Sequence, residues 1–93
     1  MEMIILIGYF AAFFTTASSL PQAYKTLKTQ NTDGLSFLYF AFLDFGILLW
    51  AIYGTLINDM PLMITNYTSF IIISSILVVI LKNYYINSKK LKN

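Results

Sequence analysis

The fold of this 93-residue chain is decided by residues 37–81, FLYFAFLDFGILLWAIYGTLINDMPLMITNYTSFIIISSILVVIL. This stretch holds two apolar runs separated only by the short polar turn Ile57-Asn58-Asp59. Each run reaches the length of about 20 residues that a helix needs to cross a bilayer. A third apolar run precedes them, so the sequence predicts an all-α membrane protein with three transmembrane helices, at about residues 3–24, 37–57 and 61–81.

The composition indicates the same class. Hydrophobic residues make up 58% of the chain and charged residues only 11%, whereas a soluble domain carries about 25% charge. The three spans form one unit over residues 1–85, which leaves residues 86–93 as a polar tail. Without Cys, His or Arg, the chain lacks the side chains of thiolate nucleophiles, Ser-His-Asp triads and soft metal sites. We therefore expect no enzyme, no metal site and no cofactor.

The lysines indicate how the chain is oriented. They form two clusters, Lys25 with Lys28, and Lys82 with Lys89, Lys90 and Lys92. A chain that crosses the bilayer twice between the clusters returns to its starting side, and basic loops face the cytoplasm. We expect a multi-pass protein of the cell (inner) membrane, with its N-terminus outside and its C-terminus cytoplasmic. No nucleic-acid partner is expected, because the basic residues do not alternate with aromatic ones as in single-strand binders.

The first apolar run carries two features that concern helix packing. Gly8, Ala12 and Thr16 recur every four residues, and so do Ala11, Thr15 and Ser19; small residues at this spacing let helices approach closely in lipid. The alternative is that small residues are simply common in membrane helices. Pro21 has no N–H to donate to the carbonyl of Ala17, so the first helix is expected to kink there and to continue. Ser36 is the expected N-cap of the second helix.

Trp50 and Asn66 form a candidate binding pair. Each lies seven residues from the outer turn, and so about 10 Å below the outer end of its helix. Gly46 and Gly54 lie one turn to either side of Trp50 and should leave space around the indole. A free ring face can stack against a ligand, and an amide suits hydroxyl groups. The alternative is structural: membrane Trp can anchor at the interface, and membrane Asn can join helices.

Asp44 lies near the middle of the second span, where a carboxylate costs at least about 2.5 kcal/mol. It should therefore face the bundle interior or a wet cavity. Hydroxyls at similar depth are its expected partners: Ser74 and Ser75 on the third span, and Thr15 and Thr16 on the first. Asp44 lies about 120° around the helix from Trp50, which favours a hydrogen-bonded structural acid over the alternative, a proton-coupling site.

Several motifs together resemble a known family. Pro21-Gln22 is followed by the loop Asn31-Thr32-Asp33-Gly34-Leu35-Ser36, by Leu49-Trp50-Ala51-Ile52-Tyr53-Gly54, by Asp59-Met60-Pro61 and by Asn66. These motifs are similar to those of the SemiSWEET family, the bacterial half-size relatives of the SWEET sugar transporters and members of the PQ-loop group. The likeness extends from about Gly8 to Leu81.

The resemblance implies a three-helix bundle, packed in the order one, three, two, that pairs as a parallel homodimer around a central path. It implies that Trp50 and Asn66 of both copies enclose a small sugar. Pro21 and Gln22 would form a hinge, and Tyr53 and Asp59 would belong to an outer gate. Ile57 stands where family members can carry a basic residue, so an Arg–Asp gate pair is not available here.

These observations predict a transporter that mediates facilitated diffusion (uniport) of a small mono- or disaccharide by alternating access in the lipid bilayer. Three helices cannot enclose a path for such a solute and six can, and two parallel copies follow a known repeat plan. Two alternatives stay open. One is a PQ-loop carrier of another small solute, such as an amino acid, with Asp44 handling protons. The other is a non-transporting accessory subunit of a larger membrane complex.

Overall fold

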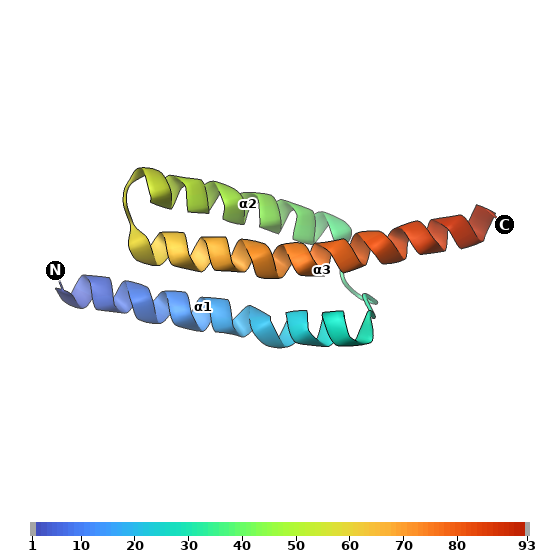
Figure 1. Ribbon diagram of the computed structural model, residues 1–93, viewed down its shortest axis with the longest axis horizontal. Coiled ribbons are helices and arrows are strands. Elements are labelled where there is room, and N and C mark those ends of the chain that lie inside the picture. Colours follow the sequence, from blue (N-terminus) through green and yellow to red (C-terminus); the bar gives the residue numbers. More distant parts are fainter. Residues whose placement is uncertain (1, 93) are drawn as a thin grey trace.

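The computed structural model describes residues 2–92, which form three long helices (Figure 1). They are α1 (Glu2–Thr29), α2 (Phe37–Leu56) and α3 (Met60–Lys92). Each helix is long and apolar enough to cross a membrane, and residues 2–92 contain no strand. The prediction of an all-α protein with three membrane-spanning helices is confirmed.

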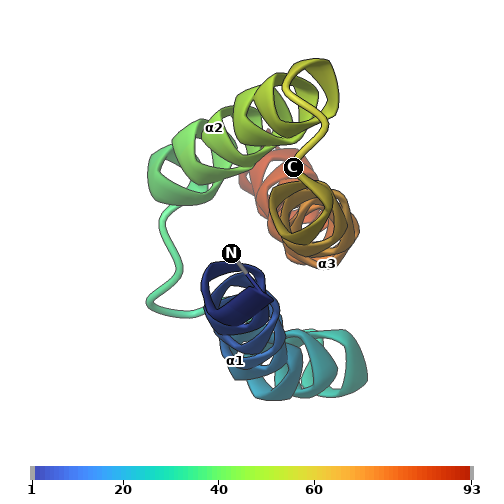
Figure 2. The same cartoon turned by 90° about the vertical axis from the view of Figure 1, so that its left-hand side faces the viewer.

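The third helix lies between the other two. Both α1 and α2 pack against α3, and within the described residues they make no contact with each other (Figures 1 and 2). The packing order is therefore α1, α3, α2, as the family resemblance implied. The arrangement leaves α1 and α2 as the two outer helices of a thin layer, whose Cα atoms extend over 61 × 24 × 15 Å.

Small residues bring α1 onto α3. Gly8, Ala12 and Thr16 are half-buried among exposed neighbours, and Ala23 is buried further along the same face. A Cβ atom added at Gly8 would lie 3.4 Å from the side chain of Pro61, which is in the first turn of α3. Of the two predicted stripes of small residues, the one formed by Gly8, Ala12 and Thr16 is thus part of the contact face of α1, whereas Ala11 and Thr15 of the other are exposed.

The main apolar core lies around α3, where α1 and α2 pack against it. It is a cluster of buried side chains from all three helices: Ala23, Phe40, Ile73, Ile76 and Ile80. Ala51 is fully buried nearby. At the outer end of the interface between α2 and α3, a Cβ on Gly54 would come within 3.2 Å of Leu62, so the glycine permits close approach of the two helices.

Local side-chain chemistry sets the helix ends near the turns. Ser36 caps α2 as predicted, with its Oγ accepting a hydrogen bond from the N–H of Tyr39 at 3.2 Å. At the other end, Asn58 takes a left-handed φ of 58°. Its N–H donates to the carbonyl of Thr55, and the N–H of Asp59 donates to that of Gly54. This Schellman pattern satisfies the last carbonyls of α2 and reverses the chain.

Two helices are longer than the predicted spans. α1 continues to Thr29 instead of ending near Tyr24, and α3 continues to Lys92 instead of ending near Leu81. With 33 residues, α3 is about 50 Å long, against a hydrocarbon core of about 30 Å. Hydropathy marks where the membrane ends, and a helix stops only where its backbone ladder is interrupted. The expected polar tail is therefore a helical extension of α3 as far as Lys92.

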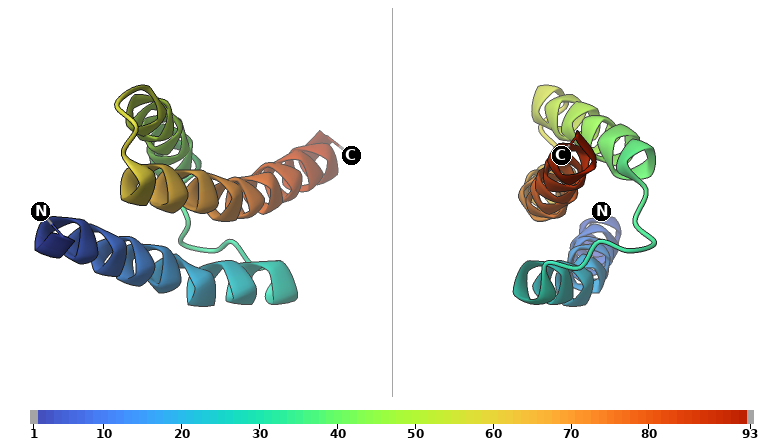
Figure 3. Two further views of the ribbon diagram at one scale, coloured as in Figure 1. Left: turned by 60° about the vertical axis from the view of Figure 1, so that its left-hand side comes forward. Right: turned by 90° about the vertical axis from the view of Figure 1, so that its right-hand side faces the viewer.

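Pro21 lies inside α1, so the helix continues through it, as expected. Figures 2 and 3 show the last turns of α1, drawn in cyan and teal, bending away from the direction of its first turns. A missing N–H and a ring that crowds the preceding turn account for such a bend.

Candidate functional site

Trp50 lies on the outside of its own protomer, with 56% of its surface exposed. It lines a hollow of about 360 Å³ together with Gly46, Leu49 and Tyr53, all residues of α2. The Trp50 and Tyr53 rings meet edge to face, with their centroids 5.7 Å apart and their planes at 82°. A hollow formed by one helix is open on its other side.

The space around the indole is only partly as predicted. A Cβ added at Gly46 would meet no atom within 4 Å, so this glycine does leave room beside Trp50. The expectation was wrong for Gly54, which is buried against Leu62 of α3. Its missing side chain serves the contact between α2 and α3 and leaves no free space at the ring.

Asn66 is half-buried on α3. Its Nδ2 donates to the carbonyl of Leu62, one turn back in the same helix, at 2.8 Å. A carboxamide has a second N–H and a carbonyl oxygen, so polar capacity remains. Asn66 does not line the hollow beside Trp50. One protomer alone therefore does not bring these two residues into a single cavity, and their joint role stays a prediction.

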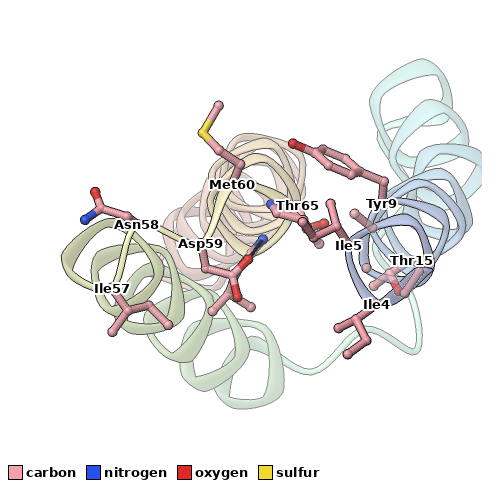
Figure 4. Close-up of a pocket in the computed structure, with 14 residues that line it drawn as sticks. Ile4, Ile5, Tyr9, Thr15, Ile57, Asn58, Asp59, Met60 and Thr65 are labelled. Carbon is pink, nitrogen blue, oxygen red and sulfur yellow. Dashed lines mark hydrogen bonds between the residues drawn. The ribbon is translucent and has the colours of Figure 1, made fainter. Parts of the chain in front are cut away.

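The two predicted gate residues line different cavities. Tyr53 lines the hollow on α2, whereas Asp59 lines a cavity of about 810 Å³ between α1 and the start of α3 (Figure 4). We call it the outer cavity, because it lies at the end of the molecule that is expected to face outward. The Oδ1 atom of Asp59 accepts a hydrogen bond from the N–H of Leu62 at 3.2 Å. Asp59 is thus the N-cap of α3, a role that accounts for an acidic residue here without a basic partner.

The outer cavity has a mostly apolar lining. Its walls are Ile4, Ile5, Gly8, Tyr9, Ala11, Ala12 and Thr15 of α1, with Ile57, Asn58, Asp59, Met60, Pro61, Leu62 and Thr65. Figure 4 shows Thr65 of α3 on the side that faces α1. Its Oγ1 is buried and has no hydrogen-bond partner among the described residues. Sequence reasoning did not single out Thr65, because a threonine in a membrane helix is unremarkable until its neighbours are known.

Pro21 and Gln22, the predicted hinge, line a third cavity of about 420 Å³ at the other end of the molecule. Its remaining walls come from the end of α1 and from the loop that follows: Lys25, Thr26, Thr29, Asn31, Asp33 and Leu35. The structure places the pair beside a cavity lined mostly by residues of polar type, and their function as a hinge stays a prediction.

Asp44 faces the interface between α2 and α3 and is only 7% exposed. Its Oδ2 accepts a hydrogen bond from the hydroxyl of Ser74 at 2.6 Å, which confirms Ser74 as a partner. Its Oδ1 is buried and has no partner among the described residues. An acid that faced lipid would have no such donor, so the prediction that Asp44 points into the bundle holds.

The other hydroxyls proposed for Asp44 are not its partners. Ser75 lies one residue further around α3 than Ser74, and its hydroxyl donates instead to the carbonyl of Ile72 at 2.6 Å. Thr15 and Thr16 belong to α1, which has no contact with α2 within the described residues. Equal depth in the membrane was a necessary condition for contact, and it was not a sufficient one.

A hydroxyl pair that the sequence did not reveal joins α2 to α3 near the outer turn. The Oγ1 of Thr55 and the phenol oxygen of Tyr67 are 2.8 Å apart. Thr55 also donates to the carbonyl of Ala51 at 2.8 Å. Since a hydroxyl has one proton, Tyr67 is then the donor to Thr55. Both residues lie close to the turn between the helices, which is the one signal that could have suggested the pair.

Known proteins are similar to this chain in sequence and in fold. The family model for the PQ loop repeat matches residues 3–63. A sugar transporter SemiSWEET from Escherichia coli is 37% identical over 83 residues, which cover 89% of this chain and 93% of the relative. A sugar transporter SemiSWEET from Leptospira biflexa is 38% identical over 72 residues, covering 77% of this chain and 85% of the relative.

A solved structure of a SemiSWEET is also similar to this chain. The crystal structure of a SemiSWEET in the inward-open conformation matches with a TM-score of 0.94 and 33% identity, and the match covers 100% of both chains. The sequence match extends over most of both relatives, and the structural match includes all three helices in their packing order. This chain therefore belongs to the SemiSWEET family of PQ-loop-repeat membrane proteins.

Proposed function

We propose that this protein carries a small sugar across the cell membrane by facilitated diffusion, as a parallel homodimer. The relatives named above are sugar transporters by name, and not enzymes, which supports the general class. The observation that carries the proposal is the position of Trp50. A half-exposed indole in a hollow formed by one helix becomes an enclosed site only when a second surface covers it.

The shape of the protomer supports a second copy as that surface. The three helices are packed in a row, with α1 and α2 each against α3 only, so one protomer does not close on itself around a central path. Such a layer cannot surround a sugar. Two copies related by an axis along the membrane normal follow the parallel-repeat plan of larger transporters. They would place two Trp50 and two Asn66 side chains around one path.

The chemistry of these side chains suits a sugar. A sugar ring has apolar C–H faces, which an indole can cover, and hydroxyl groups, which a carboxamide can bind as donor or acceptor. A buried site that hydrogen-bonds hydroxyl groups rejects ligands without them, since its own polar groups would be left unpaired. Binding and release then need a change of shape and no covalent step.

We infer that the structure corresponds to the state open to the cytoplasm. The inference rests on its similarity to the inward-open crystal structure over the full length of both chains. In this state the cavity beside Pro21 and Gln22 would be part of the inner opening. Lys25 lines this cavity, and the basic-loop rule supports a cytoplasmic position for the lysine clusters at the ends of α1 and α3. Closure would bend α1 at Pro21.

A specific observation favours one second candidate, a carrier coupled to protons. Asp44 lies buried in the membrane region with one carboxyl oxygen unpartnered among the described residues. An ionisable residue within a membrane span is a common element of proton pathways. Under the leading proposal this carboxyl is a structural link to Ser74 and takes no part in transport.

Uptake into liposomes that contain the purified protein tests these proposals. We expect uptake of radiolabelled mono- or disaccharide down its own gradient, at a rate that an imposed proton gradient leaves unchanged. Amino acids, offered at the same concentration, should not enter faster than into empty liposomes. Sugar uptake that rises with a proton gradient would support the coupled carrier. Uptake of neither solute class would contradict transport and favour an accessory subunit.

A further inference from the structure

Gln30, the first residue after α1, has a conformation that few side-chain-bearing residues adopt. Its φ is 58°, in the left-handed region, where a Cβ atom is crowded. All its polar groups are nevertheless used. Its N–H donates to Thr26 at 2.8 Å, and its Nε2 donates to Leu27 at 2.7 Å. Its Oε1 accepts from Lys82, and its carbonyl accepts from Asn83 at 2.8 Å.

Asn83 is the centre of this arrangement. It is half-buried on α3, just beyond the predicted end of the third span. One Nδ2 atom serves two acceptors, the carbonyl of Gln30 at 2.8 Å and the hydroxyl of Thr32 at 3.0 Å. A carboxamide nitrogen carries two hydrogens, so both bonds can form at once. The extension of α3 therefore holds the loop between α1 and α2 from the side.

A residue with a strained backbone conformation persists only where several contacts hold that conformation in place. At Gln30 two of the partners are residues of α3 that lie more than 50 positions away in the sequence. Without them, nothing beyond the last turn of α1 would keep the carbonyl of Gln30 turned toward α3. The loop position thus depends on Lys82 and Asn83.

The loop in turn shapes the inner cavity. Asn31, Asp33 and Leu35 of the loop line the same cavity as Pro21 and Gln22. In lipid, apolar packing of α1 on α3 gains little over contact with acyl chains, so polar contacts weigh more in deciding where a helix end lies. Moving the loop would move both the wall of this cavity and the segment of α1 that follows Pro21.

We propose that Asn83 is a positioning residue for the transport cycle. It ties the loop to α3 and thereby guides the inner segment of α1, which follows Pro21, as the inner side opens and closes. Lys82 assists through Gln30. Asn83 does not touch the substrate in this proposal, which rests on the proposed transport function. Loss of the tie should let the segment occupy unproductive positions, so the rate of turnover falls while binding at Trp50 is untouched.

The test compares Asn83→Ala with Asn87→Ala. Asn87 is the same residue type one turn further along α3, and its exposed side chain makes no hydrogen bond to the described part of the chain. Hydrogen–deuterium exchange in lipid nanodiscs reports on residues 30–36, and liposome uptake reports on transport. Asn83→Ala loses two hydrogen bonds to this loop, and we expect its exchange to rise about fivefold or more, since one ordinary hydrogen bond of about 1 kcal/mol already corresponds to about fivefold. The maximal uptake rate should fall by roughly the same factor at unchanged half-saturation, and Asn87→Ala should match the wild type.

Three outcomes would overturn the proposal: unchanged exchange, faster exchange with wild-type uptake, or a change confined to half-saturation. If Asn83→Ala does not fold, Thr32→Val removes one of its two acceptors and should give a smaller effect of the same kind. A wild-type protein that moves no sugar would refute the proposed function and with it the transport role of Asn83. The exchange data would still decide, separately, whether Asn83 holds the loop.

Discussion

Trp50 exposes about half of its surface in a hollow on α2, so its removal leaves the interface with α3 intact. We expect Trp50→Ala and Asn66→Ala each to abolish measurable sugar uptake while folding and dimer formation persist. In a symmetric dimer one substitution removes two contacts. For Asn66→Ala, two lost hydrogen bonds of about 0.5–1.5 kcal/mol each correspond to a loss of roughly 5- to 150-fold in affinity. Uptake by liposomes, with size-exclusion chromatography for the dimer, measures both effects.

Ser88→Ala in the exposed extension of α3 is the control and should behave as the wild type. Wild-type uptake by Trp50→Ala, at unchanged half-saturation, would mean that Trp50 only anchors the helix at the membrane interface. The sugar site would then have to lie elsewhere, with the outer cavity lined by Thr65 as the next place to examine.

Asp44 is expected to be dispensable for transport. In Asp44→Asn the side-chain carbonyl can still accept the hydrogen bond from Ser74, while the exchangeable carboxyl proton is gone. Uptake should stay close to the wild-type rate and should not respond to a proton gradient. Ser74→Ala removes the one donor that the described residues offer to the buried Asp44 carboxyl group and should cost about 1–3 kcal/mol of stability, measured as unfolding in detergent. A gradient response that the wild type shows and Asp44→Asn lacks would establish proton coupling.

Asp44 also marks how far sequence reasoning extends for single residues. Its inward orientation was predictable, because a carboxylate in contact with lipid is costly. Its choice of Ser74 over Ser75 was not, since neighbouring residues on a helix point about 100° apart and the rotation of α3 is set by packing. The prediction that Gly54 leaves space beside Trp50 was wrong for the same reason. The sequence shows that Gly54 has no side chain, but only the structure shows that Leu62 packs against it.

At the scale of helices, Pro21 is the position where the backbone hydrogen bonding of α1 is interrupted. Pro21→Ala restores an N–H to the carbonyl of Ala17 and relieves a steric clash that, with the lost bond, costs about 3 kcal/mol in the interior of a helix. We expect the variant to be more stable toward unfolding in detergent, by up to about that amount, and to transport more slowly, because the bend is needed for closure.

Pro61→Ala is the matched control, since the chain has two prolines and Pro61 lies in the first turn of α3. There a missing N–H costs little, and alanine keeps the Pro61 Cβ, the atom that would lie 3.4 Å from a Cβ added at Gly8. Its stability and its maximal uptake rate should both change less than those of Pro21→Ala. A Pro21→Ala protein with a wild-type uptake rate would remove Pro21 from the mechanism.

Helix positions were largely predictable and helix ends only in part. Ser36 was identified as an N-cap because its hydroxyl precedes an apolar run, a local signal that the sequence states fully. The ends at Thr29 and Lys92 were missed, since polar residues such as Lys and Asn do not stop a helix. Gln30 ends α1 with a conformation supported by Lys82 and Asn83, partners that are distant in the sequence.

For the whole molecule, the number of spans follows from hydropathy, whereas the packing order was known only through resemblance to a family. Orientation can be tested with single cysteines, because the chain has none of its own. Ile57→Cys and Lys90→Cys replace exposed residues at opposite ends. Ile57 is preferable to Asn58, whose left-handed φ a cysteine would strain. An impermeant maleimide should label Ile57→Cys from outside and Lys90→Cys only from the cytoplasm. Labelling of both from one side would contradict the topology.

A shared site at the dimer interface makes a quantitative prediction for mixed dimers. Wild-type protein and Trp50→Ala, assembled randomly at equal amounts, give about one quarter dimers with two intact chains. If each sugar needs Trp50 from both copies, uptake should fall to about one quarter of the wild-type value and follow the square of the wild-type fraction. If each protomer held its own site, uptake would fall to about one half and follow that fraction linearly. Mixing wild type with Ser88→Ala should cause no loss. A linear dependence would contradict the shared site, because the hollow beside Trp50 would then have to work without the partner copy that is proposed to close it.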